Sequence, residues 1–260
     1  MAAPFAIEAE NIYFSYAAEP PVLRGLSMRA ARGEFVCVLG HSGCGKSTLL
    51  NIVMGLLRPS SGTVRVNGDE IRGPGTDRAI VFQDYSLFPW MTALGNVAFA
   101  ARHARKISKA EAASLAGEYL AQVGLYGDRA KYPHQLSGGM RQRVAIARAL
   151  AMDAGTWLFD EPFSALDPRM RRSLQTLVGE VAKRGTGRTV LFVTHNVDEA
   201  VTLGERILFM DGGAIRREVP VPFGYPRVHK EITGTREYFS LVSRLAEYFC
   251  EAGERRAAER

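Results

Sequence analysis

The segment EFVCVLGHSGCGKSTLLNIVMGLL, Glu34 to Leu57, sets the architecture of the chain. A continuous apolar run ends at a glycine, a glycine-rich stretch follows, and leucine and isoleucine then recur at helical spacing. This order predicts a buried strand, a tight loop and a helix. The loop, Gly40 to Thr48, fits the pattern G-x-x-x-x-G-K-S/T in the context that the pattern requires.

The residue types in this loop suit the phosphates of a nucleotide. Glycines allow the backbone to wrap closely around phosphate oxygens with its N–H groups turned inward. Lys46 would reach the β- and γ-phosphates, and the Ser47 hydroxyl would ligate Mg²⁺. Cys44 either fills space in the loop or is a thiol activated by the helix N-terminus. We expect the whole loop to bind the nucleotide: Gly40, His41, Ser42, Gly43, Cys44, Gly45, Lys46, Ser47 and Thr48.

Strands and helices alternate along the rest of the chain. Residues 156–161 and 188–195 are buried-type apolar runs, and a stretch with helical spacing at 168–184 separates them. Such a strand–helix–strand order implies a parallel sheet. Further strands are predicted at 62–68 and 78–83, half-buried strands at 6–16 and 22–30, and a hairpin at 206–219 that turns at Asp211, Gly212 and Gly213.

A long segment rich in Ala, Arg and Lys interrupts this core between residues 83 and 156. Its apolar residues have helical periodicity at 108–125 and 139–152. We interpret the segment as a helical subdomain inserted into the α/β core. Residues 236–249 predict an amphipathic helix near the end of the chain.

Composition excludes several classes of protein. With 260 residues, 47% hydrophobic and 23% charged, the chain has the balance of a soluble globular protein. No stretch approaches the roughly 20 apolar residues of a membrane span, and the N-terminus lacks the pattern of a signal peptide, so we expect a cytoplasmic chain. The cysteines (Cys37, Cys44 and Cys250) have no metal-ligand or disulfide spacing. The net charge is +6, but lysine and arginine are spread along the sequence with acidic residues among them. This favours a solvated surface over a site for a polyanion, either nucleic acid or an acidic membrane surface.

Two adjacent carboxylates end one of the buried strands, in the stretch TWLFDEP, Thr156 to Pro162. The carboxyl ends of parallel strands meet at the edge of the sheet where α/β folds bind ligands. Asp160 would therefore hold Mg²⁺ through its water shell, and Glu161 would orient and deprotonate an attacking water.

A second candidate anion site lies in QLSGGMRQR, Gln135 to Arg143, where Ser-Gly-Gly runs into the start of a helix. The free N–H groups of a helix N-terminus and the positive end of its dipole point at the same place. The stretch therefore predicts an anion site nearly a hundred residues after the first one.

With the glycine-rich loop, LSGGMRQR and LFDEP in this order, the sequence resembles the ATP-binding cassette (ABC) transporter ATPases over nearly its whole length. Of these motifs, Ser-Gly-Gly is the most specific. The resemblance implies a P-loop NTPase (RecA-like) α/β core with an N-terminal antiparallel β subdomain and an inserted α-helical subdomain. It implies one ATPase domain: a core at about 1–84 and 156–220, a helical subdomain at about 85–155 and a helical tail at about 221–260.

The resemblance assigns further roles to single residues. Tyr16 matches an aromatic that stacks on adenine, although an aromatic in a strand is more often part of the core. Gln83 matches a glutamine that contacts Mg²⁺ and the water and senses the membrane partner. His195 matches a switch histidine near the γ-phosphate, so the catalytic set is Glu161, His195 and Gln83. Ser164, Ala165, Leu166 and Asp167 match a loop that links the two sites of a dimer.

The resemblance also implies a head-to-tail dimer, either a homodimer or a pair of ATPases. In it Ser137, Gly138 and Gly139 of one chain close over the γ-phosphate of the ATP held, with Mg²⁺, by the other. Residues 83–100 would form a groove for a coupling helix of a membrane subunit. The predicted contact residues are Tyr85, Leu87, Phe88 and Trp90; alternatively, these side chains pack the helical subdomain.

A separately encoded ATPase is typical of importers, which pair it with two permease subunits and an extracytoplasmic solute-binding protein. We therefore expect a peripheral subunit at the cytoplasmic face of the inner membrane. GHSGCGKST with QDYSLFPWMTALGNV looks most like the nitrate, sulfonate and taurine branch. The chain ends at residue 260, after a hairpin that closes at Val219, and we expect no regulatory β-domain. The alternatives are an ATPase of a non-import membrane complex and, less favoured, one that acts on DNA or ribosomes.

Overall fold

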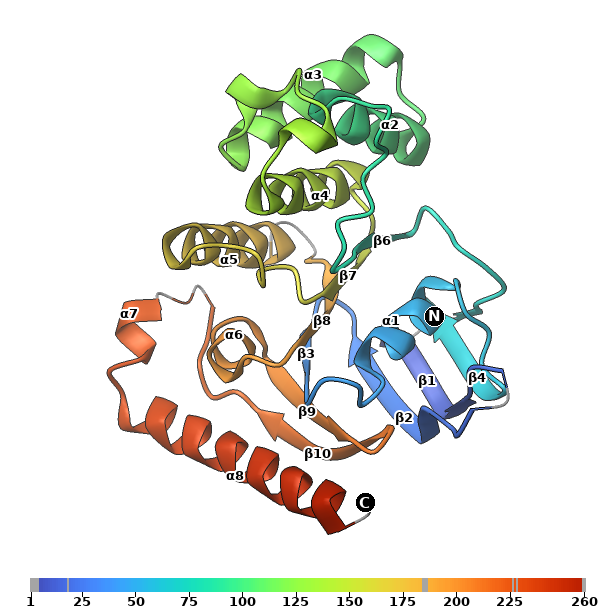
Figure 1. Cartoon of the computed structure of the whole chain (residues 1–260), viewed down its shortest axis with the longest axis vertical. Coiled ribbons are helices and arrows are strands. Elements are labelled where there is room, and N and C mark those ends of the chain that lie inside the picture. Colours follow the sequence, from blue (N-terminus) through green and yellow to red (C-terminus); the bar gives the residue numbers. More distant parts are fainter. Residues whose placement is uncertain (1–4, 18, 184–186, 226, 228, 259–260) are drawn as a thin grey trace. The chain divides into compact units, whose positions relative to one another are not determined.

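The computed structural model describes residues 5–17, 19–183, 187–225, 227 and 229–258 (Figure 1). The chain divides into two compact units. The first consists of Met1–Pro74 and Gly179–Arg260, and the second of Gly75–Val178. The ranges predicted for the core and the tail include residues 1–4, 18, 184–186, 226, 228, 259 and 260, which lie outside the described residues.

An antiparallel sheet opens the first unit, as the sequence predicted. Its strands are β1 (Phe5–Phe14), β2 (Leu23–Ala31), β4 (Ser61–Val66) and β5 (Asp69–Glu70), in the order β2-β1-β4-β5. β1 pairs antiparallel with both β2 and β4. One face of β1 is buried through Ile7, Ala9, Ile12 and Phe14, with an irregularity at Asn11 that explains why the sequence alternates only in part.

The same unit also contains a set of parallel strands. β3 (Phe35–Leu39) lies between β8 (Thr189–Thr194) and β9 (Arg206–Asp211) and is parallel to both. β10 (Ala214–Pro220) pairs antiparallel with β9 and closes the predicted hairpin at Gly212–Gly213. Every residue of β3 and β8 is buried, as continuous apolar runs predict. Leu39 pairs with Thr194, so β3 and β8 end at the same edge.

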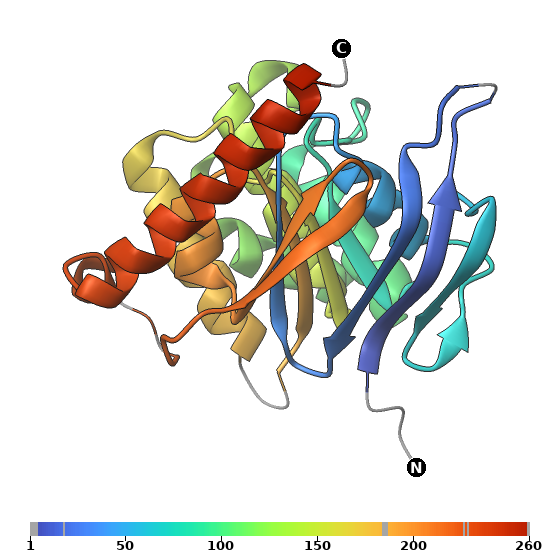
Figure 2. The same ribbon diagram turned by 90° about the horizontal axis from the view of Figure 1, so that it is seen from below.

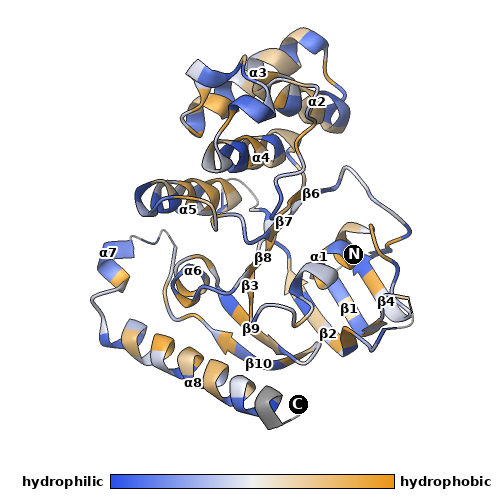
Figure 3. Cartoon of the chain, in the orientation of Figure 1, coloured by the Kyte–Doolittle hydropathy of each residue, from blue (hydrophilic) through white to orange (hydrophobic). Residues whose placement is uncertain are grey.

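The described residues of this unit form the helices α1 (Lys46–Met54), α6 (Val197–Leu203), α7 (His229–Ile232) and α8 (Arg236–Ala258). α8 lies along the β9–β10 hairpin (Figures 1 and 2). The ring of Phe209 on β9 contacts those of Tyr248 and Phe249 on α8. Figure 3 shows hydrophobic and hydrophilic residues alternating along α8, as expected of an amphipathic helix. The sequence did not predict α6, because a helix of 7 residues is too short to show a helical period in its apolar residues.

In the second unit, β6 (Arg78–Val81) and β7 (Thr156–Asp160) pair in parallel. The helices α2 (Ala93–Arg105), α3 (Lys109–Gln122) and α4 (Gly138–Met152) pack on one another, and short 3₁₀ turns lie at Tyr126–Asp128 and Pro133–Gln135. α5 (Pro168–Lys183) begins in this unit and ends in the first; Arg184, the last residue of its predicted range, lies outside the described residues. The inserted helical subdomain is confirmed, and α2 is a helix that the periodicity did not single out.

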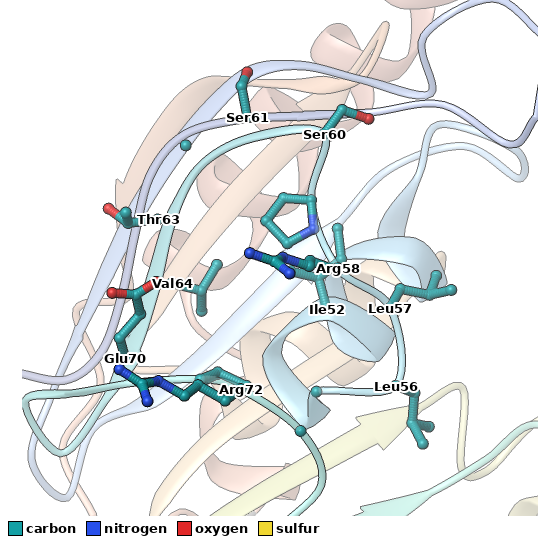
Figure 4. Close-up of a pocket in the computed structure, with 15 residues that line it drawn as sticks. Ile52, Leu56, Leu57, Arg58, Ser60, Ser61, Thr63, Val64, Glu70 and Arg72 are labelled. Carbon is teal, nitrogen blue, oxygen red and sulfur yellow. The ribbon is translucent and has the colours of Figure 1, made fainter.

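α1, the helix that follows the glycine-rich loop, ends at Gly55, whose N–H bonds to the carbonyls of Asn51 and Ile52. A hollow of about 800 Å³ lies beyond this end of α1, against β4 and β5 (Figure 4). Among the described residues, the lining starts at Ile52, so the hollow is separate from the loop at the other end of the helix. Gly55 has φ +84°, and a Cβ on it would lie 2.3 Å from the carbonyl oxygen of Gly73.

Replacing Gly55 by alanine should therefore destabilise the protein. We expect Gly55→Ala to lower the free energy of unfolding by about 2 to 4 kcal/mol, because the left-handed backbone and the overlap with Gly73 both oppose a side chain. Gly73→Ala is the matched control, since a Cβ there meets nothing within 4 Å. Urea denaturation measures both variants, and equal midpoints for the two would contradict the expectation.

Candidate functional site

The glycine-rich loop connects β3 to α1 and holds its lysine inside. Lys46 is only 4% exposed, and its Nζ donates to the carbonyl oxygens of Gly40 at 2.8 Å and of His41 at 2.7 Å. A buried ammonium needs such acceptors, because an unpaired buried charge costs several kcal/mol. Gly40 packs so closely on the carbonyl of Met210 that a Cβ would lie 2.3 Å from it. The loop is therefore shaped by backbone contacts that only glycine permits.

The start of α1 offers free hydrogen-bond donors. Gly45 is its N-cap, no side chain caps the helix, and the first turn contains no acidic residue. The positive end of the helix dipole and the first backbone N–H groups thus remain available to an anion. Ser47 is exposed beside them, whereas Cys44 is buried against Gly40 and fills the loop.

Tyr16 reaches the same loop from the turn after β1. Its Oη lies 3.2 Å from the Oγ1 of Thr48, and its ring makes an edge contact with Phe14. The side chain is 41% exposed, so it is not a core aromatic. An exposed ring face at this position offers a stacking surface for a base.

His195 lies at the edge where the loop begins. It is exposed and directly follows β8, whose last residue, Thr194, pairs with Leu39 at the end of β3. The Oγ1 of Thr194 donates to Glu199 at 2.7 Å and accepts from the N–H of Asn196 at 3.0 Å. The first unit therefore brings together Tyr16, the loop and a His195 held on a hydrogen-bonded turn.

The second unit brings Gln83 and the two carboxylates to one edge. β6 and β7 are parallel with Val81 opposite Phe159, so Gln83 and Asp160 lie at neighbouring strand ends. Asp160 is 7% exposed, and Gln83 is exposed. Glu161 has φ +46°, a left-handed conformation that costs a non-glycine residue about 1 to 2 kcal/mol. Backbone strain of this kind clusters at functional sites, which supports a chemical role for Glu161.

Ser137 caps α4 with its side chain: the Oγ accepts from the N–H of Met140 at 3.2 Å. The sequence suggested that Ser-Gly-Gly precedes the helix. In the structure α4 begins at Gly138, so both glycines lie inside its first turn. The two glycines are half-buried, and a Cβ on them would lie 3.3 Å from the Oη of Tyr85 and 3.2 Å from the carbonyl oxygen of Ala165. The first turn contains no acidic residue. The N-terminus of α4 thus keeps the features of an anion site.

The loop from Ser164 to Asp167 is tied to α5. The Oδ1 of Asp167 accepts from the N–H groups of Arg169 and Met170 at 3.1 and 3.0 Å, which caps the helix. Ser164 and Ala165 are exposed, whereas Leu166 is only 6% exposed and packs inward. The sequence did not reveal this capping role of Asp167.

The aromatic segment after Gln83 divides into an inner and an outer part. Tyr85 is half-buried; its ring lies under the guanidinium of Arg141, and its carbonyl accepts from Arg148. Burial lowers the pKa of Arg148, and the carboxylate of Asp84 opposes that shift. Trp90, by contrast, is 69% exposed. Leu87 and Phe88 are half-buried, and the Phe88 ring contacts those of Trp90 and Phe99.

Asn96 on α2 holds this aromatic segment, and sequence reasoning missed it. It is fully buried; its Oδ1 accepts from the N–H of Phe88 at 2.8 Å, and its Nδ2 donates to the carbonyls of Phe88, Met91 and Thr92 at 3.1 to 3.2 Å. One side chain thus bonds to four backbone groups around Trp90, of which the carbonyls of Phe88 and Thr92 also accept from the N–H groups of Met91 and Asn96. A polar residue on the apolar face of a helix was the available signal.

Known proteins resemble this chain closely. The family model described as ABC transporter matches residues 23–164. The bicarbonate transport ATP-binding protein CmpD of Synechocystis is 44% identical over 85% of this chain and 79% of its own. The nitrate import ATP-binding protein NrtD of Synechococcus elongatus is 41% identical over 87% and 84%, and the taurine import ATP-binding protein TauB of Chromobacterium violaceum is 46% identical over 80% and 79%.

Solved structures agree with the sequence comparisons. A dimeric, post-hydrolysis structure of the ATP-binding cassette MJ0796, bound to ADP and phosphate, superposes with a TM-score of 0.77 at 32% identity. The match covers 84% of this chain and all of that one. In the part of the chain that the structure describes, no helix is long and apolar enough to span a bilayer.

Removing the amide of Asn96 should release the Trp90 segment. Asn96→Leu removes the partner of the Phe88 N–H and of the Met91 carbonyl, and we expect it to lower the free energy of unfolding by about 2 to 4 kcal/mol. Arg102→Ala, at an exposed position of the same helix, should change it by less than about 0.5 kcal/mol. Thermal unfolding and acrylamide quenching of tryptophan fluorescence measure the effects; an unchanged midpoint for Asn96→Leu would exclude the anchoring role.

Proposed function

The chain belongs to the ABC transporter family and is an ATPase, and we propose that it drives import of a small solute through separate membrane subunits. The solute class is a small oxyanion or sulfonate, such as nitrate, bicarbonate or taurine. The names of similar ATP-binding proteins support both the direction of transport and the class of solute.

One observation carries the proposal: the loop Gly40–Thr48 holds a buried Lys46 beside an uncapped helix N-terminus. This combination suits the triphosphate of ATP, which needs backbone N–H groups and a cation together. We assign the phosphates to this loop and the adenine to the exposed ring of Tyr16. The γ-phosphate would be sensed by His195, which follows the strand beside β3.

Mg²⁺ fits the donors that the chain offers. The Ser47 hydroxyl, the Gln83 side-chain amide and the Asp160 carboxylate all provide oxygen, the ligand atom that Mg²⁺ prefers. The ion would offset the negative charge of the phosphates. Glu161 is assigned as the residue that orients and deprotonates the attacking water, with Gln83 and His195 assisting. The strained backbone of Glu161 supports this assignment.

A single chain leaves one side of the nucleotide open to water, and we assign that side to a second chain. Ser137, Gly138 and Gly139 form a helix N-terminus without acidic residues in its first turn, which suits the γ-phosphate held by the partner. The loop Ser164–Asp167 would link the two sites. ATP then binds the closed dimer better than the open pair, and loss of the γ-phosphate reverses the shift. Similarity to dimeric cassettes supports this arrangement.

The motion needs a receiver in the membrane. Trp90 is a large exposed aromatic next to Phe88, the type of side chain that anchors protein interfaces. We assign this aromatic segment, with Tyr85 and Leu87, to contact with one of two permease subunits at the cytoplasmic face of the inner membrane. An extracytoplasmic binding protein would deliver the solute.

Affinity purification of the full chain from native membranes tests the proposal directly. A polytopic membrane protein should co-purify, and in vesicles the complex should hydrolyse ATP faster when the solute and its binding protein are added. Recovery without a membrane protein, together with DNA binding that weakens steeply as salt rises, would contradict an importer.

Glu161→Gln should bind ATP but hardly hydrolyse it. The amide keeps the shape of the side chain and cannot accept a proton, so we expect hydrolysis to fall by about 10²- to 10⁴-fold. The bound ATP should then trap a dimer that size-exclusion chromatography detects. Hydrolysis at the wild-type rate would remove Glu161 from the role of base.

Ser137→Arg should separate binding from hydrolysis. The bulky cation blocks the N-terminus of α4, which serves only the partner's nucleotide, so ATP affinity of the monomer should stay unchanged. We expect hydrolysis to fall by about 10²- to 10³-fold, as for other lost donors to a reacting phosphate or oxyanion. Ser114→Arg, at an exposed position of α3, is the matched control. Loss of monomer affinity in Ser137→Arg would overturn the assignment to the partner's site.

A further inference from the structure

The C-terminal helix α8 contacts the phosphate loop directly. The Nε2 of His41 lies 3.2 Å from the backbone carbonyl of Phe249, and the two rings meet edge to face with centroids 4.8 Å apart. Because a carbonyl only accepts, His41 carries its proton on Nε2 and donates it. The ring of Phe249 also packs on Phe209 of β9 at 5.2 Å, which fixes it to the sheet. The imidazole is therefore held from outside the loop.

His41 also connects this contact to Lys46. Its own carbonyl oxygen accepts from the Nζ of Lys46 at 2.7 Å. A displacement of the His41 ring therefore moves one of the two backbone acceptors that position the ammonium. In this way α8 influences the position of Lys46, although no residue of α8 is part of the loop.

Residues of α7 and α8 also hydrogen-bond to α6, the helix that follows His195. Asp198 lies in the first turn of α6; it accepts from the Oη of Tyr238, and the Nε2 of His229 lies 3.1 Å from both of its carboxylate oxygens. Burial and the neighbouring carboxylate raise the pKa of Tyr238, which keeps the phenol protonated as a donor. Only Asn196 separates His195 from the first residue of α6.

Arg227 holds the other end of α6. Its guanidinium donates to the carbonyls of Val201, Thr202 and Gly204 at 2.9, 3.3 and 2.6 Å, and it lies over the ring of Tyr225. The carbonyls at a helix C-terminus have no partners within the helix, so such a cation satisfies them. A helix of 7 residues is marginal by itself. α6 therefore depends on contacts at both of its ends.

We propose that Arg227, α7 and α8, here called the C-terminal strap, form a positioning element for ATP hydrolysis. The strap holds the phosphate loop through His41 and the His195 turn through α6, and so sets the two loops in one arrangement. The inference rests on the roles proposed above for Lys46 and His195. The strap residues that make these contacts, Arg227, His229, Tyr238 and Phe249, touch neither ATP nor the attacking water in this scheme; they are positioning residues.

Two separate contacts predict two separate kinetic effects. The His41–Phe249 contact bears on the loop that binds phosphate, so losing it should weaken ATP binding. The Tyr238–Asp198 contact bears on the turn of His195, which acts on the γ-phosphate during the reaction, so losing it should slow turnover. A strap that only packed against the core would not split its effects between KM and kcat.

Tyr238→Phe tests the α6 contact, because it keeps the ring and removes the donor to Asp198. In steady-state MgATP hydrolysis by the full chain, kcat should fall about three- to tenfold, as expected when a hydrogen bond to a charged group is lost, with KM changed less than about twofold. Adding Asp198→Asn should cost less than the sum of the single effects, since both act through one pair. Arg244→Ala, exposed on the same helix, should leave both constants unchanged.

Phe249→Leu tests the loop contact. It removes the ring beside His41 but keeps the backbone carbonyl, and KM for ATP should rise about three- to tenfold with little change in kcat. Tyr248→Leu is the matched control: it removes the other ring on Phe209, 5.7 Å away, and should leave KM as in the wild type. Melting temperatures of all variants show how much of any change is lost stability.

Two results would overturn the strap. One is unchanged kcat and KM in both Tyr238→Phe and Phe249→Leu; the other is that both variants alter the two constants in the same way as their controls. The proposed function fails on a different result, since Lys46→Ala would then hydrolyse ATP at the wild-type rate whatever the strap variants do. The two failures are therefore distinguishable.

Discussion

A buried ammonium with backbone acceptors is the constraint on which the site depends. Lys46 is withdrawn from water, and the carbonyls of Gly40 and His41 accept its hydrogen bonds. For these carbonyls to point inward, the chain must turn sharply after β3, and Gly40 must press against the backbone of Met210 on β9. The charge of one side chain thus ties the shape of the loop to the parallel pairing of β3 and β9.

Parallel pairing then decides which residues meet. In each unit two strands run side by side in register and end together, and the residues to which we assign the chemistry lie at or just beyond those ends. The first unit gathers the loop and His195 in this way, and the second gathers Gln83 with Asp160 and Glu161. Glu161 adopts a strained backbone conformation, whereas His195 lies on a turn that is stabilised by the hydrogen bonds of Thr194.

The helix after His195 shows how the C-terminal part of the chain supports the candidate site. α6 has 7 residues, too few to be stable alone, and its partners come from Arg227, His229 and Tyr238. α8 continues from there to the phosphate loop, where Phe249 meets His41. Short helices and tight loops at a site are held by contacts from distant sequence, because their own local interactions are too few.

The sequence by itself determined the features that rest on local patterns. Several features follow from residue spacing, turn chemistry and periodicity over about ten residues. They are the loop with its strand and helix, the buried strands that end at Asp160 and just before His195, the hairpin at Gly212–Gly213 and the helices α3, α4 and α8. The family resemblance came from the order of those patterns.

Only the tertiary structure decided which of these residues face inward and which outward. Tyr85 and Trp90 look alike in the sequence, but Tyr85 lies beside α4 and Trp90 faces solvent. Asn96 reads as one polar residue in a helix until its four backbone partners are seen, and nothing local links His41 to Phe249, 208 residues later. Such contacts depend on how whole elements pack, and periodicity along one segment carries no information about its neighbours in space.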